Sequence, residues 1–274
     1  MSTEVLRYTA FSTDPAGGNP AGVVLDASEL ADTDLLRIAA EVGYSETAFL
    51  TRTADRDYRV RYFSPLAEVD FCGHATIATS VALAERIGAG SLVLHTNTGD
   101  VRVQTALGRA TLTSVAPHSR PATPTEVADT LRALRWAATD LDPAFPARVA
   151  YAGNDHLMLG AASRARLATL DYDFDALGSI MRTAGWTTVH LFHADAPRHF
   201  QARDPFPVGG VVEDPATGAA AAAFGGYLRD IGYADTGTIT IEQGVDLGRP
   251  SQLEVDLDSG APGISVTGAA VRIG

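Results

Sequence analysis

The chain has 274 residues, of which 46% are hydrophobic and 20% charged, the balance of a packed globular protein rather than of a disordered or fibrous one. Its formal net charge of −12 disfavours nucleic acid and anionic membrane surfaces as partners, because their phosphates would be repelled. The single cysteine, Cys72, excludes an intrachain disulfide.

Segments that would indicate export or a bound cofactor are not found in the sequence. The N-terminal stretch MSTEVLRYTAF lacks the positive region and apolar run of a secretory signal, so we expect a cytoplasmic protein. Neither a glycine-rich dinucleotide fingerprint nor a phosphate loop occurs. One thiol and scattered histidines do not make a zinc pattern, and His190 and His193 would point to opposite faces of a shared strand. The sequence therefore predicts neither a metal nor a cofactor.

The first half of the chain alternates strand-like runs with turns and contains two helices. Strands are expected over 5–11 and 22–26, on either side of the turn DPAGGNP. A helix over 33–42 follows and stops at Gly43. The runs SETAFLT and DYRVRYFS predict strands that lead into a helix over 73–88. Two or three antiparallel strands come next, with turns at NTGD and LGR.

A Pro-, Ser- and Thr-rich segment from Ala116 predicts the boundary between two halves, residues 1–117 and 118–262. The C-terminal strand, about 263–274, is a candidate to return to the first half. In the second half, helices are expected near 126–138, 174–184 and 217–231. Strands are expected around 147–151, 156–159, 187–193 and 199–203, and three short strands close the chain.

The helices over 73–88 and 217–231 end alike, in ALAERIG at Gly88 and GYLRDIG at Gly232. Their bodies are small and apolar around most of the circumference, which is typical of helices buried on nearly all sides. These features predict an α+β fold of two pseudo-symmetric halves, each with strands wrapped around a central buried helix. Two ordinary core helices with coincidental endings remain the alternative.

Both central helices begin with glycine, at Gly73 and Gly218. A helix start exposes unpaired N–H groups and carries partial positive charge, so two such starts facing one cleft would bind a small carboxylate or an enolate. His74 would lie on the first turn, where the helix dipole favours a neutral imidazole. A capping or core histidine is the alternative interpretation of His74.

Two carboxylates are candidates for a part in this chemistry. Glu46 stands in the apolar, strand-like run GYSETAFL, where a carboxylate is a candidate general base; the alternative is a solvated residue in a turn over 45–47. Asp214 precedes the second helix, and its alternative role is simple complementarity to the helix dipole.

Five ordered strings, GGNPAGVVLDASEL, SETAFL, FCGHATIAT, EDPATGAAA and QGVDLGRPS, resemble the phenazine biosynthesis PhzF-like proteins along nearly the whole chain. The resemblance implies the diaminopimelate epimerase fold, in which each half is a β-rich sheet or barrel around a central helix and the active site lies between the helix starts. It also implies a homodimer.

The resemblance further implies that a glutamate moves a proton between two carbons of an unsaturated cyclic amino acid, without metal or cofactor. By motif this glutamate is Glu46, with Gly73 and His74 as the glycine and histidine and Asp214 as the aspartate. The family has a serine after TG that contacts the substrate, whereas this chain has Ala219 after Gly218. One hydrogen bond to that substrate would then be missing, which costs about 1–3 kcal/mol.

Related epimerases and proline racemases use two thiols, one at each helix start. Cys72 occupies the first position, but no second cysteine exists, so two-thiol racemisation within the chain is excluded. A mixed pair of Cys72 and Glu46 stays open, as does Cys72 as a small buried hydrophobe.

The sequence thus predicts a cofactor-independent isomerase that shifts a proton on a small, cyclic or unsaturated, carboxylate-bearing metabolite. Glu46 would be the general acid and base, His74 and Asp214 would hold and polarise the substrate, and Gly73, Gly218, Ala219 and Cys72 would contact it. A racemase using Cys72 with another base and a non-catalytic binding protein of the same fold are the alternatives.

Overall fold

The computed structural model of the protein describes residues 3–258 and 262–274. Within the described residues, the contacts divide the chain into two compact units, Met1–Thr113 with Thr267–Gly274, and Ser114–Val266. The first unit thus combines the N-terminal part of the chain with its last residues. Each unit is described by itself below.

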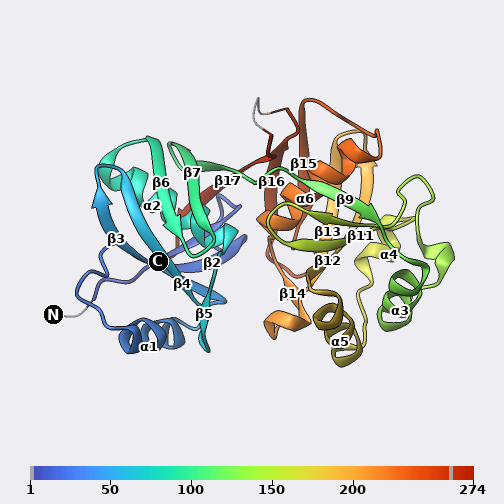
Figure 1. Cartoon of the computed structure of the whole chain (residues 1–274), viewed down its shortest axis with the longest axis horizontal. Coiled ribbons are helices and arrows are strands. Elements are labelled where there is room, and N and C mark those ends of the chain that lie inside the picture. Colours follow the sequence, from blue (N-terminus) through green and yellow to red (C-terminus); the bar gives the residue numbers. More distant parts are fainter. Residues whose placement is uncertain (1–2, 259–261) are drawn as a thin grey trace. The chain divides into compact units, whose positions relative to one another are not determined.

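The first unit contains two helices, α1 and α2, and a curved β-sheet (Figure 1). The helices are α1 (Asp32–Val42) and α2 (Gly73–Ile87). The strands are β1 (Leu6–Ala10), β2 (Asn19–Val24), β3 (Glu46–Ala54), β4 (Asp57–Phe63), β5 (Glu68–Val69), β6 (Gly90–Thr96), β7 (Gly99–Ala106), β8 (Arg109–Thr113) and β17 (Ser265–Arg272).

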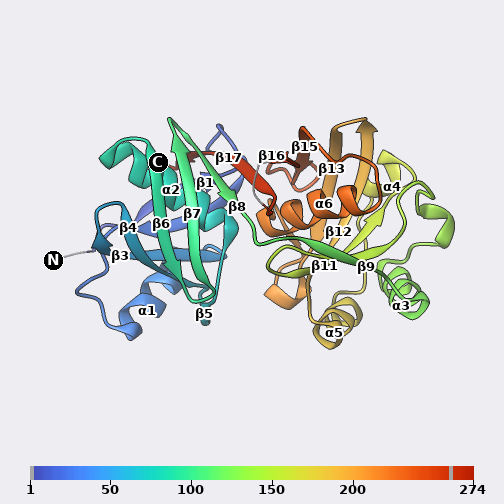
Figure 2. The same cartoon turned by 45° about the horizontal axis from the view of Figure 1, so that its top comes forward.

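The sheet of this unit closes into a barrel of eight strands. The pairings run β17–β1–β2–β3–β4–β6–β7–β8, and β8 pairs again with β17. A hydrogen bond of 2.7 Å between Thr111 and Thr267 marks the place where the ring closes. Helix α2 runs inside the strands, and α1 lies outside them (Figures 1 and 2).

The second unit is built from the remaining elements, with short 3₁₀ segments at Ala138–Asp140 and Pro207–Gly209. Its helices are α3 (Pro124–Leu134), α4 (Arg164–Ala168), α5 (Phe174–Ala184) and α6 (Gly218–Asp230). Its strands are β9 (His118–Pro121), β10 (Arg148–Tyr151), β11 (Asp155–Gly160), β12 (Trp186–Ala196), β13 (His199–Pro205), β14 (Glu213–Asp214), β15 (Thr238–Gln243) and β16 (Ser251–Asp256).

Strand pairing repeats from one unit to the other. In the first unit β1–β2 is antiparallel, β2–β3 parallel, β3–β4 antiparallel and β4–β6 parallel. The series β10–β11, β11–β12, β12–β13 and β13–β15 has the same four directions in the same order. Each unit also inserts a two-residue strand, β5 or β14, directly before its central helix. The repeat in the sequence is therefore also a repeat of topology.

Helices α2 and α6 are the cores of their units, and most of their side chains are buried. Two glycines make room around α6. A Cβ at Gly226 would lie 2.4 Å from Cβ of Pro117, and one at Gly225 would lie 2.9 Å from Cγ2 of Ile264. These close approaches explain why the helix tolerates two adjacent glycines, which lower helix propensity.

The Pro-rich segment after Ala116, where the sequence predicted the boundary between the halves, contains a strand: His118–Pro121 forms β9 and pairs antiparallel with β10. One helix expected from the sequence needs correction. The helix expected over 126–138 is α3 and ends earlier, at Leu134, because Arg135 takes a left-handed conformation with φ of 57°. A Pro at an edge-strand end and an arginine at a helix stop are weak local signals.

In the described residues 3–258 and 262–274, the helices are too short or too polar to cross a bilayer.

Candidate active site

Glu46 owes its position to a helix stop and a strand start. Helix α1 ends at Gly43, whose φ of 72° allows the chain to turn sharply while its N–H donates to Ala39 O. Strand β3 then begins at Glu46, which pairs in parallel with Ala21 of β2. The Glu46 side chain is 15% exposed, so this carboxylate is partly accessible at the end of a strand and is not a solvated turn residue.

Cys72 and His74 lie at the start of α2. Cys72 is the N-cap residue in an extended conformation, and its carbonyl accepts hydrogen bonds from Thr76 N at 3.0 Å and from Thr76 Oγ1 at 2.7 Å. The hydroxyls of Tyr62 and Thr76 lie 2.6 Å apart in the barrel core. Side-chain hydroxyls from the sheet and the helix thus fix the first turn of α2.

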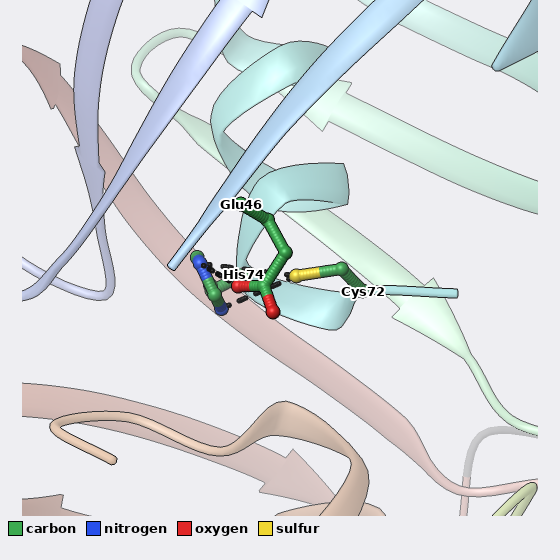
Figure 3. A group of neighbouring side chains, drawn as sticks. All are labelled: Glu46, Cys72 and His74. Atoms are coloured by element: carbon green, nitrogen blue, oxygen red, sulfur yellow. Dashed lines mark hydrogen bonds and ion pairs between the residues drawn. The ribbon is translucent and has the colours of Figure 1, made fainter. Parts of the chain in front are cut away.

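The side chains of Glu46, Cys72 and His74 converge (Figure 3). Glu46 Oε2 lies 3.3 Å from His74 Nε2, and Cys72 Sγ lies 3.4 Å from His74 Nδ1 and 3.8 Å from Nε2. Ser45 Oγ lies 3.4 Å from the same Nε2. Three groups that the sequence separates by up to 28 positions therefore form one cluster, in which Glu46 is more exposed than the buried Cys72 and His74.

Asn19, the first residue of β2, holds the other side of the imidazole. Its Nδ2 lies 3.1 Å from His74 Nδ1. Because an amide nitrogen can only donate, this arrangement makes Nδ1 the acceptor and leaves the ring proton on Nε2, facing Glu46. Burial lowers the pKa of His74, and the nearby charge of Glu46 offsets part of this effect. The histidine is thus neutral at physiological pH and carries one donor.

The second helix start has its own polar network. Thr217, the N-cap residue of α6, donates from Oγ1 to Asp214 Oδ2 at 2.6 Å. Gln243 of β15 donates from Nε2 to Asp214 O at 2.8 Å, and its Oε1 accepts from Thr217 N at 3.0 Å. Asp214 is buried in β14, and Gly218 and Ala219 are the first two residues of α6.

An ion pair anchors β14 beneath this helix start. Arg203 of β13 donates from Nε to Glu213 Oε1 at 2.9 Å, and from Nη1 to Ala168 O at 2.8 Å. The exposed fractions of the Arg203 and Glu213 side chains are 10% and 1%. This buried pair fixes the strand that carries Asp214.

Four buried residues form a further polar cluster in the second unit. Thr188 donates from Oγ1 to Asp204 Oδ1 at 2.9 Å, and His156 Nδ1 lies 2.8 Å from the same hydroxyl oxygen. His190 Nδ1 lies 3.1 Å from Asp204 Oδ1. His193, on the same strand as His190, instead contacts Ala161 O.

The structure brings together three of the residues selected from the sequence, Glu46, Cys72 and His74, with Gly73 between the last two. Asp214, Gly218 and Ala219 belong to the second unit. The sequence analysis missed the contacts of Asn19, Ser45 and Gln243. Asn19 and Ser45 lie in or beside the motif strings GGNPAG and SETAFL, so the signal for these two residues was the motif itself.

Residues 8–274 match a family model described as "phenazine biosynthesis-like protein". The chain belongs to this family. An isomerase of Bacillus subtilis, YfhB, is 31% identical over 98% of this chain and 96% of its own. Trans-2,3-dihydro-3-hydroxyanthranilate isomerase of Pseudomonas aeruginosa is 36% identical over 89% of this chain and 86% of its own. The chain is thus an isomerase of the phenazine biosynthesis-like family.

Solved structures agree with this assignment of the fold. A PhzF family protein of Bacillus anthracis has a TM-score of 0.85 and 26% identity, covering 99% of this chain and 98% of its own. A probable proline racemase from Agrobacterium radiobacter has a TM-score of 0.68 with 15% identity, and covers 98% of this chain and 91% of its own. The α+β fold predicted from the sequence is confirmed, and the family shares it with racemases of low sequence identity.

Proposed function

We propose that this isomerase moves a proton between two carbons of a small, cyclic or unsaturated, carboxylate-bearing metabolite, with Glu46 as the acid and base. The observation that supports it is the position of Glu46: its carboxylate is partly exposed and lies 3.3 Å from a neutral, buried histidine. Of the three clustered side chains, Glu46 is the most accessible to a substrate.

In this reaction a single residue, Glu46, both removes the proton and returns it. The Glu46 carboxylate removes a proton from a substrate carbon, and the electron pair left behind is delocalised into the conjugated carboxylate or enolate. The resulting Glu46 carboxylic acid returns the proton to a second carbon of the same molecule, so that neither an oxidant nor a co-substrate is needed. The Nε2–H of His74 lies 3.3 Å from Glu46 Oε2 and faces the carboxylate before the transfer.

Negative charge that develops on the substrate needs donors. The first N–H groups of α2, which begins at Gly73, and the positive end of its dipole favour a carboxylate or enolate oxygen there. We assign further substrate contacts to Asp214, Gly218 and Ala219 of the second unit, on the strength of the family motif EDPATG. The substrate class rests on the Pseudomonas aeruginosa relative, whose name specifies an unsaturated cyclic amino acid.

A racemase in which Cys72 acts as an acid–base group together with another base is the second candidate. It is favoured by one distance: the donor atoms of Cys72, His74 and Glu46 all lie within 4.8 Å of one another. Thr217 occupies the N-cap of α6 where a two-thiol enzyme would carry its second cysteine, so any such racemase would be asymmetric. A non-catalytic binding protein of the same fold is the third candidate.

Proton NMR in D₂O tests all three candidates. A panel of unsaturated, hydroxy and amino carboxylic acids is incubated with the wild-type protein and with Glu46→Gln. We expect deuterium to enter one compound at carbon with the wild type, and the rate to fall by about 100-fold or more in the variant. Exchange that persists in Glu46→Gln but is lost after thiol alkylation would support the racemase. No exchange with any compound of a panel that includes the relative's substrate would contradict the proposal and favour a binding protein.

A further inference from the structure

The cluster at the start of α2 contains the three donor types that a thiophilic divalent cation prefers. Cys72 offers sulfur, His74 offers an imidazole nitrogen and Glu46 a carboxylate oxygen, and these donor atoms lie within 4.8 Å of one another. Thiolate and imidazole select Zn²⁺ over Mg²⁺ and Ca²⁺, which prefer oxygen ligands. The donors come from two elements, β3 and α2, whose first residues are fixed by the barrel.

Distances between the donors agree with tetrahedral zinc. Bond lengths of about 2.3 Å to sulfur and about 2.0–2.2 Å to nitrogen and oxygen imply separations of about 3.6 Å for S···N and about 3.4 Å for N···O at the tetrahedral angle. Through His74 Nε2 the observed separations are 3.8 Å to Cys72 Sγ and 3.3 Å to Glu46 Oε2. The third separation, between the donor atoms of Cys72 and Glu46, is within 4.8 Å, and side-chain rotation has to bring these two donors onto the same ion.

Groups behind the cluster support this geometry. Asn19 contacts the remaining ring nitrogen of His74. With an ion on Nε2 the ring proton lies on Nδ1, so the Asn19 amide has to turn its Oδ1 toward Nδ1 and accept that proton, as the outer partners of metal-binding histidines do. The hydrogen bonds of Thr76 to the carbonyl of Cys72 fix the backbone from which Sγ projects. Three protein ligands leave the fourth position of the ion to water or to a substrate carboxylate.

We propose that Zn²⁺ binds reversibly to Glu46, Cys72 and His74 and inhibits the isomerase. On binding, a Zn–S bond forms as the Cys72 thiol releases its proton to solvent. The His74 ring proton moves from Nε2 to Nδ1, so that Nε2 donates its lone pair to the ion, and the Glu46 carboxylate donates a lone pair as well. A carboxylate in this state is no longer available to take a proton from substrate. The inhibition rests on the function proposed above, whereas the binding of the ion does not.

Binding is measured first, without turnover. Chelator-treated, reduced protein is dialysed against ZnCl₂, and we expect about one ion per chain, with MgCl₂ and CaCl₂ unable to compete. Cys72→Ser and Glu46→Gln should each weaken binding by at least about tenfold. The control is His199→Ala, a histidine outside the cluster that lies 3.6 Å from Asp195 and 3.4 Å from Glu242. Loss of binding in this control with retention in Cys72→Ser would overturn the proposal.

The absorption spectrum of the wild-type protein with Co²⁺ tests the site without relying on the folding of any variant. The wild-type protein loaded with Co²⁺ should show a thiolate-to-cobalt charge-transfer band, and the absence of that band would overturn the site. Inhibition is then tested in the deuterium-exchange assay, where zinc should abolish exchange and a chelator should restore it. Zinc that binds without inhibiting, or that activates, would overturn the inhibitory role. A Glu46→Gln variant that exchanges deuterium at the wild-type rate without zinc would contradict the proposed function, whatever the result for zinc binding.

Discussion

Asn19 determines which nitrogen of His74 carries the ring proton. An amide nitrogen donates to Nδ1, so the proton lies on Nε2 and points to Glu46. Asn19→Asp would reverse this arrangement, because a carboxylate accepts from a protonated Nδ1. We expect turnover in the deuterium-exchange assay to fall by about tenfold or more, since Glu46 then loses its donor.

The matched control for this prediction is Asn19→Ala, which removes the amide without imposing the opposite tautomer. Nitrogen-15 spectra of the His74 ring would report the tautomer in each variant. The Asp variant should be slower than the Ala variant and should carry the proton on Nδ1. A reversed tautomer with a wild-type rate would contradict the role of Asn19.

Ala219 stands where the resemblance to the family implies a serine that contacts the substrate. Because the family has a serine there, Ala219→Ser would supply the missing hydroxyl at the second residue of α6. We expect kcat/KM for trans-2,3-dihydro-3-hydroxyanthranilate to rise by about tenfold, within the 1–3 kcal/mol of a buried hydrogen bond. Ala220→Ser, at the fully buried neighbour, should give no such gain. Equal gains in both variants would contradict a specific contact.

At the scale of elements, the repeat places the same ion pair in two different environments. Arg61 of β4 pairs with Glu68 of β5, and Arg203 of β13 pairs with Glu213 of β14. The exposed fractions of Arg61 and Glu68 are 26% and 29%, against 10% and 1% for the second pair. Each pair holds the two-residue strand that leads into a central helix. The two pairs can therefore be compared to measure how burial changes the contribution of an ion pair to stability.

Removing the acid from each pair should therefore have unequal effects. Glu213→Gln leaves the buried Arg203 with only Asp246, at 4.0 Å, as a counter-charge, and we expect the free energy of unfolding to fall by about 3 kcal/mol. Glu68→Gln should lower it by about 1 kcal/mol or less, because water solvates Arg61. Urea denaturation of both variants measures the difference. Equal losses would show that burial does not govern the strength of the pair.

At the scale of the whole molecule, stability should depend on pH through a buried histidine. Burial lowers the pKa of His156 from 6.5 to about 4, and His190 adds to this effect, while the charge of Asp204 opposes it. The unfolded chain thus binds a proton between pH 6.5 and about 4 that the folded chain does not bind. Stability contributed by His156 is present above pH 6.5 and is lost as the pH falls through this window.

Between pH 7 and pH 5 the loss from His156 should be about 2 kcal/mol. This range avoids most of the titration of carboxylates, whose ordinary pKa values lie lower. The lowered pKa of His74 acts in the same direction. Urea denaturation at the two pH values, for the wild type and for His156→Gln, measures the effect. A variant that loses as much stability as the wild type would exclude His156 as a source.

Local signals in the sequence predicted the elements well where caps and periodicity agree. Helix α5 is found at the predicted 174–184, because Asp173 accepts from Ala176 N at its start and Gly185 ends it with φ of 76°. The two central helices are found within one residue of their predicted ends. The proximity of Glu46 to His74 was indicated by the family motifs, and no periodicity in the sequence would have shown it.

Local signals in the sequence could not predict the closure of the barrel. It depends on the pairing of β8 with β17, as in the contact of Thr111 with Thr267, and residues this far apart leave no common pattern in the sequence. The buried cluster of His156, Thr188, Asp204 and His190 was missed for the same reason, because three strands contribute to it. In the sequence analysis, His190 was considered only as a metal ligand and not as a member of a buried polar cluster.

The return of β17 to the first unit has a consequence for how the chain is made. A ribosome finishes β1 to β8 long before it reaches residues 267–274, so the strand that joins β8 to β1 is synthesised after the whole second unit. Until then the first barrel is open, with two unpaired edges that invite association with other chains. A gene cut between the units would leave that opening permanent, so the duplicated halves are no longer separable as independent proteins.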